Sequence, residues 1–245
     1  MSGRTLTQKE QKELVGKSII DYLIDNNKLR SGMKVGLGTG STAMPAVKRL
    51  AERIADGTLQ NIKAVPTSFQ TSLACEDFGI PLFSLNSKEI GGELDIAIDG
   101  ADEIDPKNNV IKGGGAAHVR EKIVEYSASV FVVIADESKL VQSLGHSFPL
   151  PVEIIGEARV SVMKQIEKKG ASCILREGVK KAGPVVTDNG NLILDVLWPA
   201  GVSVDPVKME DELNMIAGVV ENGFFTKKRP LVMTAHADGS IKVRE

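Results

Sequence analysis

The sequence predicts an α/β protein in which a Rossmann-like, doubly wound domain with a mainly parallel sheet is joined to a smaller α+β (ferredoxin-like) domain. Three observations carry this prediction. Short runs rich in β-branched residues alternate with helical patterns over the first half of the chain, which indicates parallel strands covered on both faces. The polar turn Thr187–Asn191 lies between two apolar runs and indicates a hairpin. The stretch 230–243 has the pattern of a closing hairpin that returns to the first sheet.

The elements of the first half follow in order. A capping-box pattern at Thr7 and Glu10 begins a helix that ends at the polar pair 26–27. A short strand at 34–38 then runs into a glycine turn, and Ser41 is expected to cap the next helix, which continues to Ile54. Further patterns predict strands over 62–65, 81–85, 94–98 and 130–135 and helices over 69–78 and 116–128.

The chain changes character near Gly145. A helix over 158–168, the hairpin turn and a helix over 206–216 predict a small α+β domain. We therefore expect residues 1–144 plus 228–245 to form the Rossmann-like catalytic domain and residues 145–227 to form the smaller domain.

Composition restricts the class of partner. Of the 245 residues, 42% are hydrophobic, which is enough for a substantial core. The chain has thirty basic and thirty-two acidic residues, so sequence-independent binding to nucleic acid is not expected. The partner should be a small molecule.

The cysteines and the apolar runs bear on location. Cys75 and Cys173 form no CxxC pair, which is typical of a reducing compartment. No apolar run approaches the roughly 18 residues of a membrane helix, and the N-terminal stretch is too polar for a signal peptide. We expect a cytoplasmic protein, or an organellar one if a transit peptide has been removed.

Polar residues gather where the predicted strands end. Ligands of an open parallel sheet bind beyond the carboxyl ends of its strands. The clusters found there are 38–42, 66–68, 99–102 and 136–139. Any strand-to-helix loop tends to be polar, so each cluster alone is a weak signal, but the four together predict a binding site at this edge.

The first cluster, "GLGTGST", predicts a phosphate site at Thr39, Gly40, Ser41 and Thr42. Glycines let backbone N–H groups turn toward an anion, and the hydroxyls add donors at a helix N-terminus. Position 41 is Ser where a dinucleotide fingerprint needs Gly, and no G-K-[ST] follows as in a P-loop. A phosphate monoester remains, with a plain strand-to-helix turn as the alternative.

The second cluster, "DGAD", places Asp99 and Asp102 on either side of Gly100 and Ala101. Two carboxylates in a turn can hold magnesium, position sugar hydroxyls or cap the turn. The sequence favours hydroxyls, because Lys112 is near and the remaining acids, Glu103 and Asp105, are expected to face solvent. No metal is expected.

The stretch "KGGGAAHVREKIVE" contains Lys112, Gly113, Gly114, Gly115 and Glu121. Three glycines cost backbone entropy and suggest close approach of a ligand. The following helix is expected to pack through positions 119 and 123, which would turn Glu121 away from that face. No cation lies four residues from Glu121, so partial burial would raise its pKa and suit a general base. A solvated surface glutamate is the alternative.

The histidines are assigned no chemistry. His118 is expected to be a surface or packing residue, and His146 and His236 lack the spacing of zinc ligands.

Several long motifs occur in one order along nearly the whole chain: "VGLGTGSTA", "IDGADEID", "KGGGAA" followed by "REKIVE", "IADESK", "FPLPVE" and "VTDNGN". Together they resemble ribose 5-phosphate isomerase of the A type. The resemblance implies interconversion of D-ribose 5-phosphate and D-ribulose 5-phosphate through an enediolate, in the non-oxidative pentose phosphate pathway or the Calvin cycle. It implies no metal or organic cofactor, and a homodimer or homotetramer.

The same resemblance implies roles for individual residues. Glu121 corresponds to the general base and Lys112 to the lysine beside the reacting oxygens. Asp99 and Asp102 fall where the family binds the sugar and assists ring opening. The remaining implied substrate contacts are Lys12, Thr39, Gly40, Ser41, Thr42, Gly100, Ala101, Gly113, Gly114, Gly115 and Lys139.

Two other functions compete with this one. An acyl-CoA transferase has a related fold and uses a glutamate as nucleophile. A non-catalytic sugar-phosphate sensor would need a DNA-binding module, and the single helix before Val35 leaves no room for a helix-turn-helix.

Overall fold

The computed structural model describes residues 5–245, which divide into two compact units. Unit 1 takes in the chain up to Gly100, Arg120–Lys139 and Pro230–Glu245. Unit 2 comprises Ala101–Val119 and Leu140–Arg229. The division into separate folding domains with bounds at residues 145 and 228 stays a prediction.

Unit 1 is built on a six-stranded sheet in the order β13–β12–β6–β3–β1–β2. Every neighbouring pair is parallel except β12 and β13, which form the expected C-terminal hairpin on β6. The mainly parallel sheet confirms the predicted fold class. The strands are β1 (Lys34–Leu37), β2 (Lys63–Pro66), β3 (Leu94–Gly100), β6 (Ala128–Asp136), β12 (Leu231–Ala235) and β13 (Ile241–Arg244).

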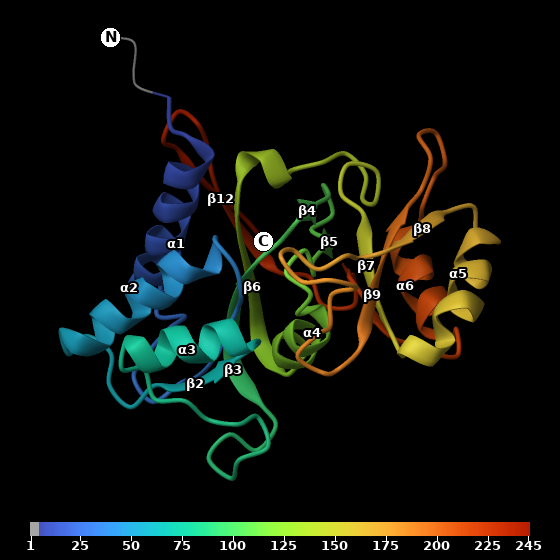
Figure 1. The fold of residues 1–245 in the computed structure, drawn as a ribbon. Helices are drawn as coiled ribbons and strands as arrows, with labels where there is room; N and C mark the ends of the chain where they lie inside the picture. Colours follow the sequence, from blue (N-terminus) through green and yellow to red (C-terminus); the bar gives the residue numbers. More distant parts are fainter. Residues whose placement is uncertain (1–4) are drawn as a thin grey trace. The chain divides into compact units, whose positions relative to one another are not determined.

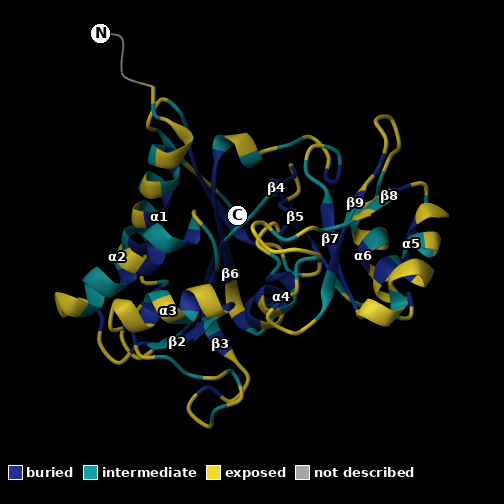
Figure 2. Cartoon of the chain, viewed as in Figure 1, coloured by how far each residue is buried: buried dark blue, intermediate teal, exposed yellow. Residues whose placement is uncertain are grey.

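Helices cover both faces of this sheet. α1 (Gln8–Asp25) and α2 (Ala43–Ala55) lie on one side of β6 and α4 (His118–Tyr126) on the other (Figure 1). Ile96 and Ile98 of β3 join the cluster under α1 and α2, whereas Ala97 packs with Val124 of α4. Successive strand residues face opposite sides, so both faces are apolar and the central strands are buried (Figure 2).

The start of α1 follows the expected capping box. The Thr7 hydroxyl accepts from the Glu10 backbone N–H, and the Glu10 carboxylate accepts from the Thr7 backbone N–H at 2.9 Å. The apolar stripe of α1 is buried at Val15, Ile19 and Leu23. None of the helices described in residues 5–245 combines the length and apolar character needed to cross a bilayer.

Unit 2 contains the antiparallel sheet β10–β7–β9–β8 with α5 (Arg159–Glu167) and α6 (Pro206–Asn214). A second small sheet has the order β11–β5–β4. These features confirm the predicted smaller α+β architecture. The strands are β4 (Glu103–Ile104), β5 (Val110–Ile111), β7 (Leu150–Ile154), β8 (Ser172–Leu175), β9 (Leu192–Leu197), β10 (Val219–Asn222) and β11 (Phe224–Phe225), and short 3-10 turns lie at Glu137–Lys139 (η1) and Gly156–Ala158 (η2).

Several local predictions were wrong. Residues 81–85 form no strand: only Leu82 bridges to Ala64, because the chain turns to pack Phe83 and Leu85 against the cluster beneath α4. The helix expected over 116–128 is α4, which is shorter because β6 already begins at Ala128. α3 (Phe69–Asp77) agrees with its prediction within one residue.

The predicted cap of α2 was also wrong. Thr42 occupies the N-cap and makes no side-chain cap hydrogen bond, while Ser41 is exposed and accepts a hydrogen bond from Lys12. The Thr187 turn was confirmed, since the Thr187 N–H donates to the Asn191 carbonyl at 2.9 Å. Residues 184–186, which precede this turn, form no named strand and pair through isolated bridges between Val186 and Leu192 and between Pro184 and Glu177.

Candidate active site

The strand order of unit 1 places a topological switch point between β1 and β3. The connection leaving β1 runs to β2 on one side, and the connection leaving β3 runs toward β6 on the other. Ligands of such sheets bind where the connections diverge, beyond the carboxyl ends of the strands. The predicted cluster 38–42 follows the end of β1, and the predicted cluster 99–102 begins with the last two residues of β3.

Asp99 ties the two strand ends together. Its Oδ1 accepts from the backbone N–H of Thr39 at 2.9 Å and from that of Gly100 at 2.6 Å, and the residue is 1% exposed. A Cβ on Gly38 would overlap the Asp99 carboxyl group and lie 2.5 Å from the Asp99 Cβ. Gly38 is therefore required because a carboxylate occupies the space of its missing side chain.

The Thr39 side chain is part of the scaffold. Its hydroxyl lies 2.8 Å from the Thr67 hydroxyl, 2.7 Å from that of Ser68 and 3.2 Å from that of Thr71. Thr71 in turn donates to the Gly38 carbonyl at 2.8 Å. This hydroxyl cluster fixes the glycine turn to the start of α3.

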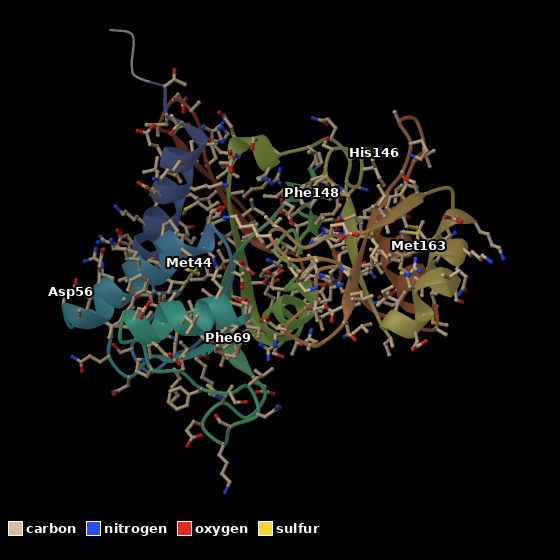
Figure 3. The ribbon with its side chains drawn as sticks, in the orientation of Figure 1. Met44, Asp56, Phe69, His146, Phe148 and Met163 are labelled. Carbon is tan, nitrogen blue, oxygen red and sulfur yellow. The ribbon has the colours of Figure 1, made fainter. Side chains whose placement is uncertain are left out.

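Basic residues surround the other end of the turn. Lys12 of α1 donates to the Ser41 hydroxyl at 3.1 Å beside a cavity of about 610 Å³. Met44 of α2, labelled in Figure 3, lines this cavity. Four lysines and one acid also line it, which makes the cavity suitable for an anion. The lining is Gln8, Lys9, Lys12, Glu13, Lys17, Ser41, Met44, Pro45, Lys48 and Phe78.

Glu121 is buried, and the predicted packing face of its helix was wrong. Ile123 is 52% exposed, whereas Glu121 is 5% exposed and Val124 is 4% exposed. α4 packs on the sheet through Val124, and Glu121 lies one turn before it on the same face. The alternative of a solvated surface glutamate is excluded.

Glu121 and Asp99 lie on the same side of the sheet and at a similar level. α4 ends two residues before β6 begins, so the helix runs antiparallel to the strands and its N-terminal turn lies toward their carboxyl ends. From Val124 to Glu121 the helix rises about 4.5 Å. From Ala97, which packs with Val124, to Asp99 the strand rises about 6.6 Å on the face covered by α4.

Lys139 follows the carboxyl end of β6 in the short turn η1 and is half-buried. It therefore lies at the same edge of the sheet as the ends of β1 and β3. Unit 1 brings Lys12, 39–42, Asp99, Glu121 and Lys139 to this edge.

Gly100 is the last residue of β3 in unit 1, and the other predicted residues belong to unit 2. Lys112 is 2% exposed, its backbone N–H donates to Gly223, and its Nζ lies 5.6 Å from the centre of the Phe225 ring. The Gly114 N–H donates to Asp102 Oδ2 at 2.8 Å. Asp102 and the triple glycine thus form one hydrogen-bonded turn, and Ala101 joins this turn to β3.

Glu103 and Asp105 were predicted to face solvent, but both are buried. Glu103 is 1% exposed, and its carboxylate accepts from the backbone N–H groups of Gly145, Ser147 and Phe148. Burial raises the pKa of Glu103 above its ordinary value although these three donors oppose the shift. Asp105 is 7% exposed and accepts from the Asn109 N–H at 2.8 Å. Both acids organise loops.

His118 is a packing residue, as expected. It is fully buried, and its Nε2 lies 3.2 Å from the Glu221 carbonyl oxygen. Within residues 5–245, no group of three or more His, Cys, Asp or Glu side chains has a geometry that would hold a metal ion.

Sequence patterns did not single out two residues that support the site. Thr71 closes the hydroxyl cluster, and Arg176 donates to the carbonyls of Gly113 and Gly114. Arg176 lies more than sixty residues from the loop it contacts, so no local pattern indicates the pairing.

Comparison with known proteins gives consistent matches. The family model described as ribose 5-phosphate isomerase A (phosphoriboisomerase A) matches residues 63–239. The chain is 61% identical to ribose-5-phosphate isomerase A of Treponema denticola over 94% of this chain and 97% of the relative. It is 55% identical to the Treponema pallidum protein of the same name, over 96% and 92%.

Solved structures agree over the whole fold. The ribose 5-phosphate isomerase A of Methanocaldococcus jannaschii is 40% identical with a TM-score of 0.86, covering 98% of this chain and 100% of that one. A D-ribose-5-phosphate isomerase in complex with phospho-erythronic acid is also 40% identical, with a TM-score of 0.90 and the same coverage.

Proposed function

The chain belongs to the ribose 5-phosphate isomerase A family, and we propose that it interconverts D-ribose 5-phosphate and D-ribulose 5-phosphate with Glu121 as the proton carrier. The observation that carries this assignment is the burial of Glu121 and Asp99 on one face of the sheet, at the carboxyl end of β3. The acyl-CoA transferase and the sensor considered from the sequence lose their support, because isomerase relatives match almost the whole chain.

The reaction suits a single carboxylate. Moving the carbonyl from C1 to C2 requires removal of the proton on C2 and its return to C1. Glu121 accepts the proton in the first step and donates it in the second, so the base is restored without another group. Burial of Glu121, which is 5% exposed, keeps bulk water away from the carboxylate and from the proton that it carries between the two carbons.

Negative charge develops on the oxygens of the enediolate formed between these steps. Lys112 is the proposed cation that stabilises this charge, together with N–H groups of Gly113–Gly115. Asp99 and Asp102 are proposed to bind sugar hydroxyls, with Gly100 and Ala101 supplying the backbone between them. Asp99 also donates the proton to the ring oxygen that opens the furanose form.

The phosphate is proposed to bind at the glycine turn. Lys12 and Ser41 are hydrogen-bonded beside a cavity rich in lysine, and Gly40 and Thr42 flank Ser41. Thr39 positions the turn through Asp99 and the hydroxyl cluster. Holding the remote phosphate fixes the reacting carbons relative to the base. Lys139 is proposed to bind the substrate from the end of β6.

Further parts of the proposal concern the protein's setting. We propose a metal-free reaction, a place in the non-oxidative pentose phosphate pathway or the Calvin cycle, and a cytoplasmic location. The free thiols of Cys75 and Cys173 support a reducing compartment. We also propose a homodimer or homotetramer, which the exposed apolar side chains of Phe69, Leu73 and Ile123 support.

Glu121→Gln tests the assignment of the base. Turnover should fall about 10²- to 10⁴-fold, the range that a positioned base contributes, while KM changes little because the amide keeps the shape of the side chain. Glu93→Gln, at an exposed position of unit 1, is the matched control and should retain full activity. A near-normal kcat in Glu121→Gln would refute the base.

Proton transfer is observed directly by NMR in D2O. Ribose 5-phosphate should yield ribulose 5-phosphate carrying deuterium at C1, since the carboxylate exchanges its proton with solvent during part of the turnovers. Ketose formation without any deuterium at C1 in wild type, together with a fully active Glu121→Gln, would point to hydride transfer.

A further inference from the structure

The triple-glycine loop of unit 2 is held by one arginine. Arg176, directly after β8, donates from Nη1 to the Gly113 carbonyl at 2.9 Å and to the Gly114 carbonyl at 3.1 Å. Its other nitrogens bind Asp195 of β9, with Nε to Oδ2 at 2.9 Å and Nη2 to Oδ1 at 2.5 Å. The two-point contact with Asp195 fixes the plane of the guanidinium, which leaves Nη1 aimed at the loop.

The carbonyl contacts determine where the loop's N–H groups point. In a trans peptide the C=O and N–H bonds point in opposite directions, and the described chain contains no cis peptide. With the Gly113 carbonyl turned to Arg176, the Gly114 N–H points the other way and donates to Asp102 at 2.8 Å. With the Gly114 carbonyl also turned to Arg176, the Gly115 N–H points away from the arginine.

The loop cannot hold this conformation by side-chain packing of its own, because glycine has the largest backbone freedom of any residue. Side chains at these positions are excluded. A Cβ on Gly113 would lie 2.7 Å from His118 Nδ1, and one on Gly114 would lie 2.7 Å from Asp102 Oδ1 and 3.0 Å from Phe148, which is labelled in Figure 3. The loop therefore needs an external constraint, and Arg176 supplies it.

We propose that Arg176, oriented by Asp195, is a positioning residue for the isomerisation. It holds the Gly115 N–H group, and through the Gly114 N–H the Asp102 carboxylate, in the orientation that receives the oxygens and hydroxyls of the reacting sugar. This inference rests on the proposed function. The Arg176 side chain is 14% exposed and that of Asp195 is 22% exposed, so the pair is shielded enough for its hydrogen bonds to fix the orientation of the guanidinium.

Arg176→Lys is the main variant, because lysine keeps the positive charge but lacks the planar fork that binds Asp195 through two nitrogens while a third nitrogen reaches the carbonyls. We expect kcat/KM to fall about 10- to 100-fold, as a misplaced catalytic group does. Inhibition by phospho-erythronic acid, which carries both a phosphate and an oxygen-rich end, should weaken by a similar factor. Inhibition by inorganic phosphate should stay within about twofold, because the proposed phosphate residues lie in unit 1.

Rescue and control variants separate positioning from folding. Guanidinium ion at millimolar concentration should restore Arg176→Ala by about tenfold or more, and ammonium ion should not. Asp195→Asn should lose activity less than Arg176→Lys does. Arg159→Ala, an exposed arginine of the same unit, should behave as wild type. If Arg176→Ala does not fold, the kinetics of Arg176→Lys and Asp195→Asn still test the inference.

Two results would overturn the inference. The first is an Arg176→Lys enzyme within about twofold of wild-type kcat/KM. The second is an equal loss of affinity for phosphate and phospho-erythronic acid, which indicates general structural damage. Glu121→Gln assayed in parallel keeps the tests independent: if it is inactive while Arg176→Lys is normal, the positioning role fails and the proposed function stands.

Discussion

Gly38→Ala changes one hydrogen into a methyl group at a position of unit 1 where the Asp99 side chain already fills the space. The new carbon would overlap the Asp99 carboxyl group and lie 2.5 Å from the Asp99 Cβ, about 0.9 Å short of the 3.4 Å at which ordinary contact begins. Asp99 is 1% exposed on the central sheet, where close packing makes a shift of its side chain costly. The carboxylate must leave its hydrogen bonds to Thr39 and Gly100.

The cost follows from these contacts. Overpacking a dense core costs about 1–3 kcal/mol, and the loss of two hydrogen bonds at about 0.5–1.5 kcal/mol each costs about 1–3 kcal/mol in net terms. The free energy of unfolding should fall by about 3–5 kcal/mol, which for a chain of this size lowers Tm by roughly 10 °C. Because the displaced group is the proposed acid for ring opening, kcat/KM should fall about 100-fold.

Urea unfolding, thermal melts and steady-state kinetics measure these effects. Gly156→Ala is the matched control, since its Cβ would meet only Leu192 at 3.5 Å, an ordinary contact. In an Asp99→Gly background, where the obstructing side chain is gone, Gly38→Ala should cost less than about 1 kcal/mol. A Gly38→Ala single variant that keeps wild-type stability and activity would refute the reasoning.

Four further predictions concern substrate binding, metal dependence, the pH dependence of stability and the reactivity of the thiols. Replacing Lys12 or Lys139 with Met should raise KM for ribose 5-phosphate by about tenfold or more with a smaller effect on kcat, and steady-state kinetics showing a defect in kcat alone would contradict the binding role. Activity should persist in excess EDTA because residues 5–245 offer no metal cluster; a loss reversed by magnesium would show otherwise. Burial raises the pKa of Glu103, so its contribution to stability is full below the ordinary value of 4.5 and is lost as pH rises through the raised pKa. Urea midpoints between about pH 4 and pH 8 should therefore decline more in wild type than in Glu103→Gln, and parallel profiles would contradict this. Burial raises the pKa of Cys75 and of Cys173 to about 11, so DTNB at pH 8 should modify both slowly until urea unfolds the chain, and rapid labelling of the native protein would be inconsistent with that burial.

The sequence predicts most of this fold because its strongest signals are local. Alternating apolar runs locate the strands of the parallel sheet, and the Thr7 capping box marks the start of α1. The sequence also indicates Asp99 and the 39–42 turn, because each lies at the carboxyl end of a predicted strand, where ligands of parallel sheets bind. These predictions require only the residues of one element at a time.

The errors arise where distant segments compete. Ile123 is apolar yet exposed, and Glu121 is charged yet buried, because Val124 rather than Ile123 meets the sheet through Ala97. Glu103 looks like a surface acid until the loop at 145–148 folds its N–H groups around it. Periodicity of an isolated helix or turn contains no information about such partners, so the buried acids were misplaced.

The order of strands in unit 1 also affects when the protein is able to fold during synthesis. β12 pairs with β6, yet the ribosome makes it only after the whole of unit 2. Until then β6 presents an unpaired edge whose side chains from Phe131 to Ala135 are all buried in the finished protein. A nascent chain with such an edge is prone to pair with other chains, so chaperones that shield it should raise the yield of active enzyme.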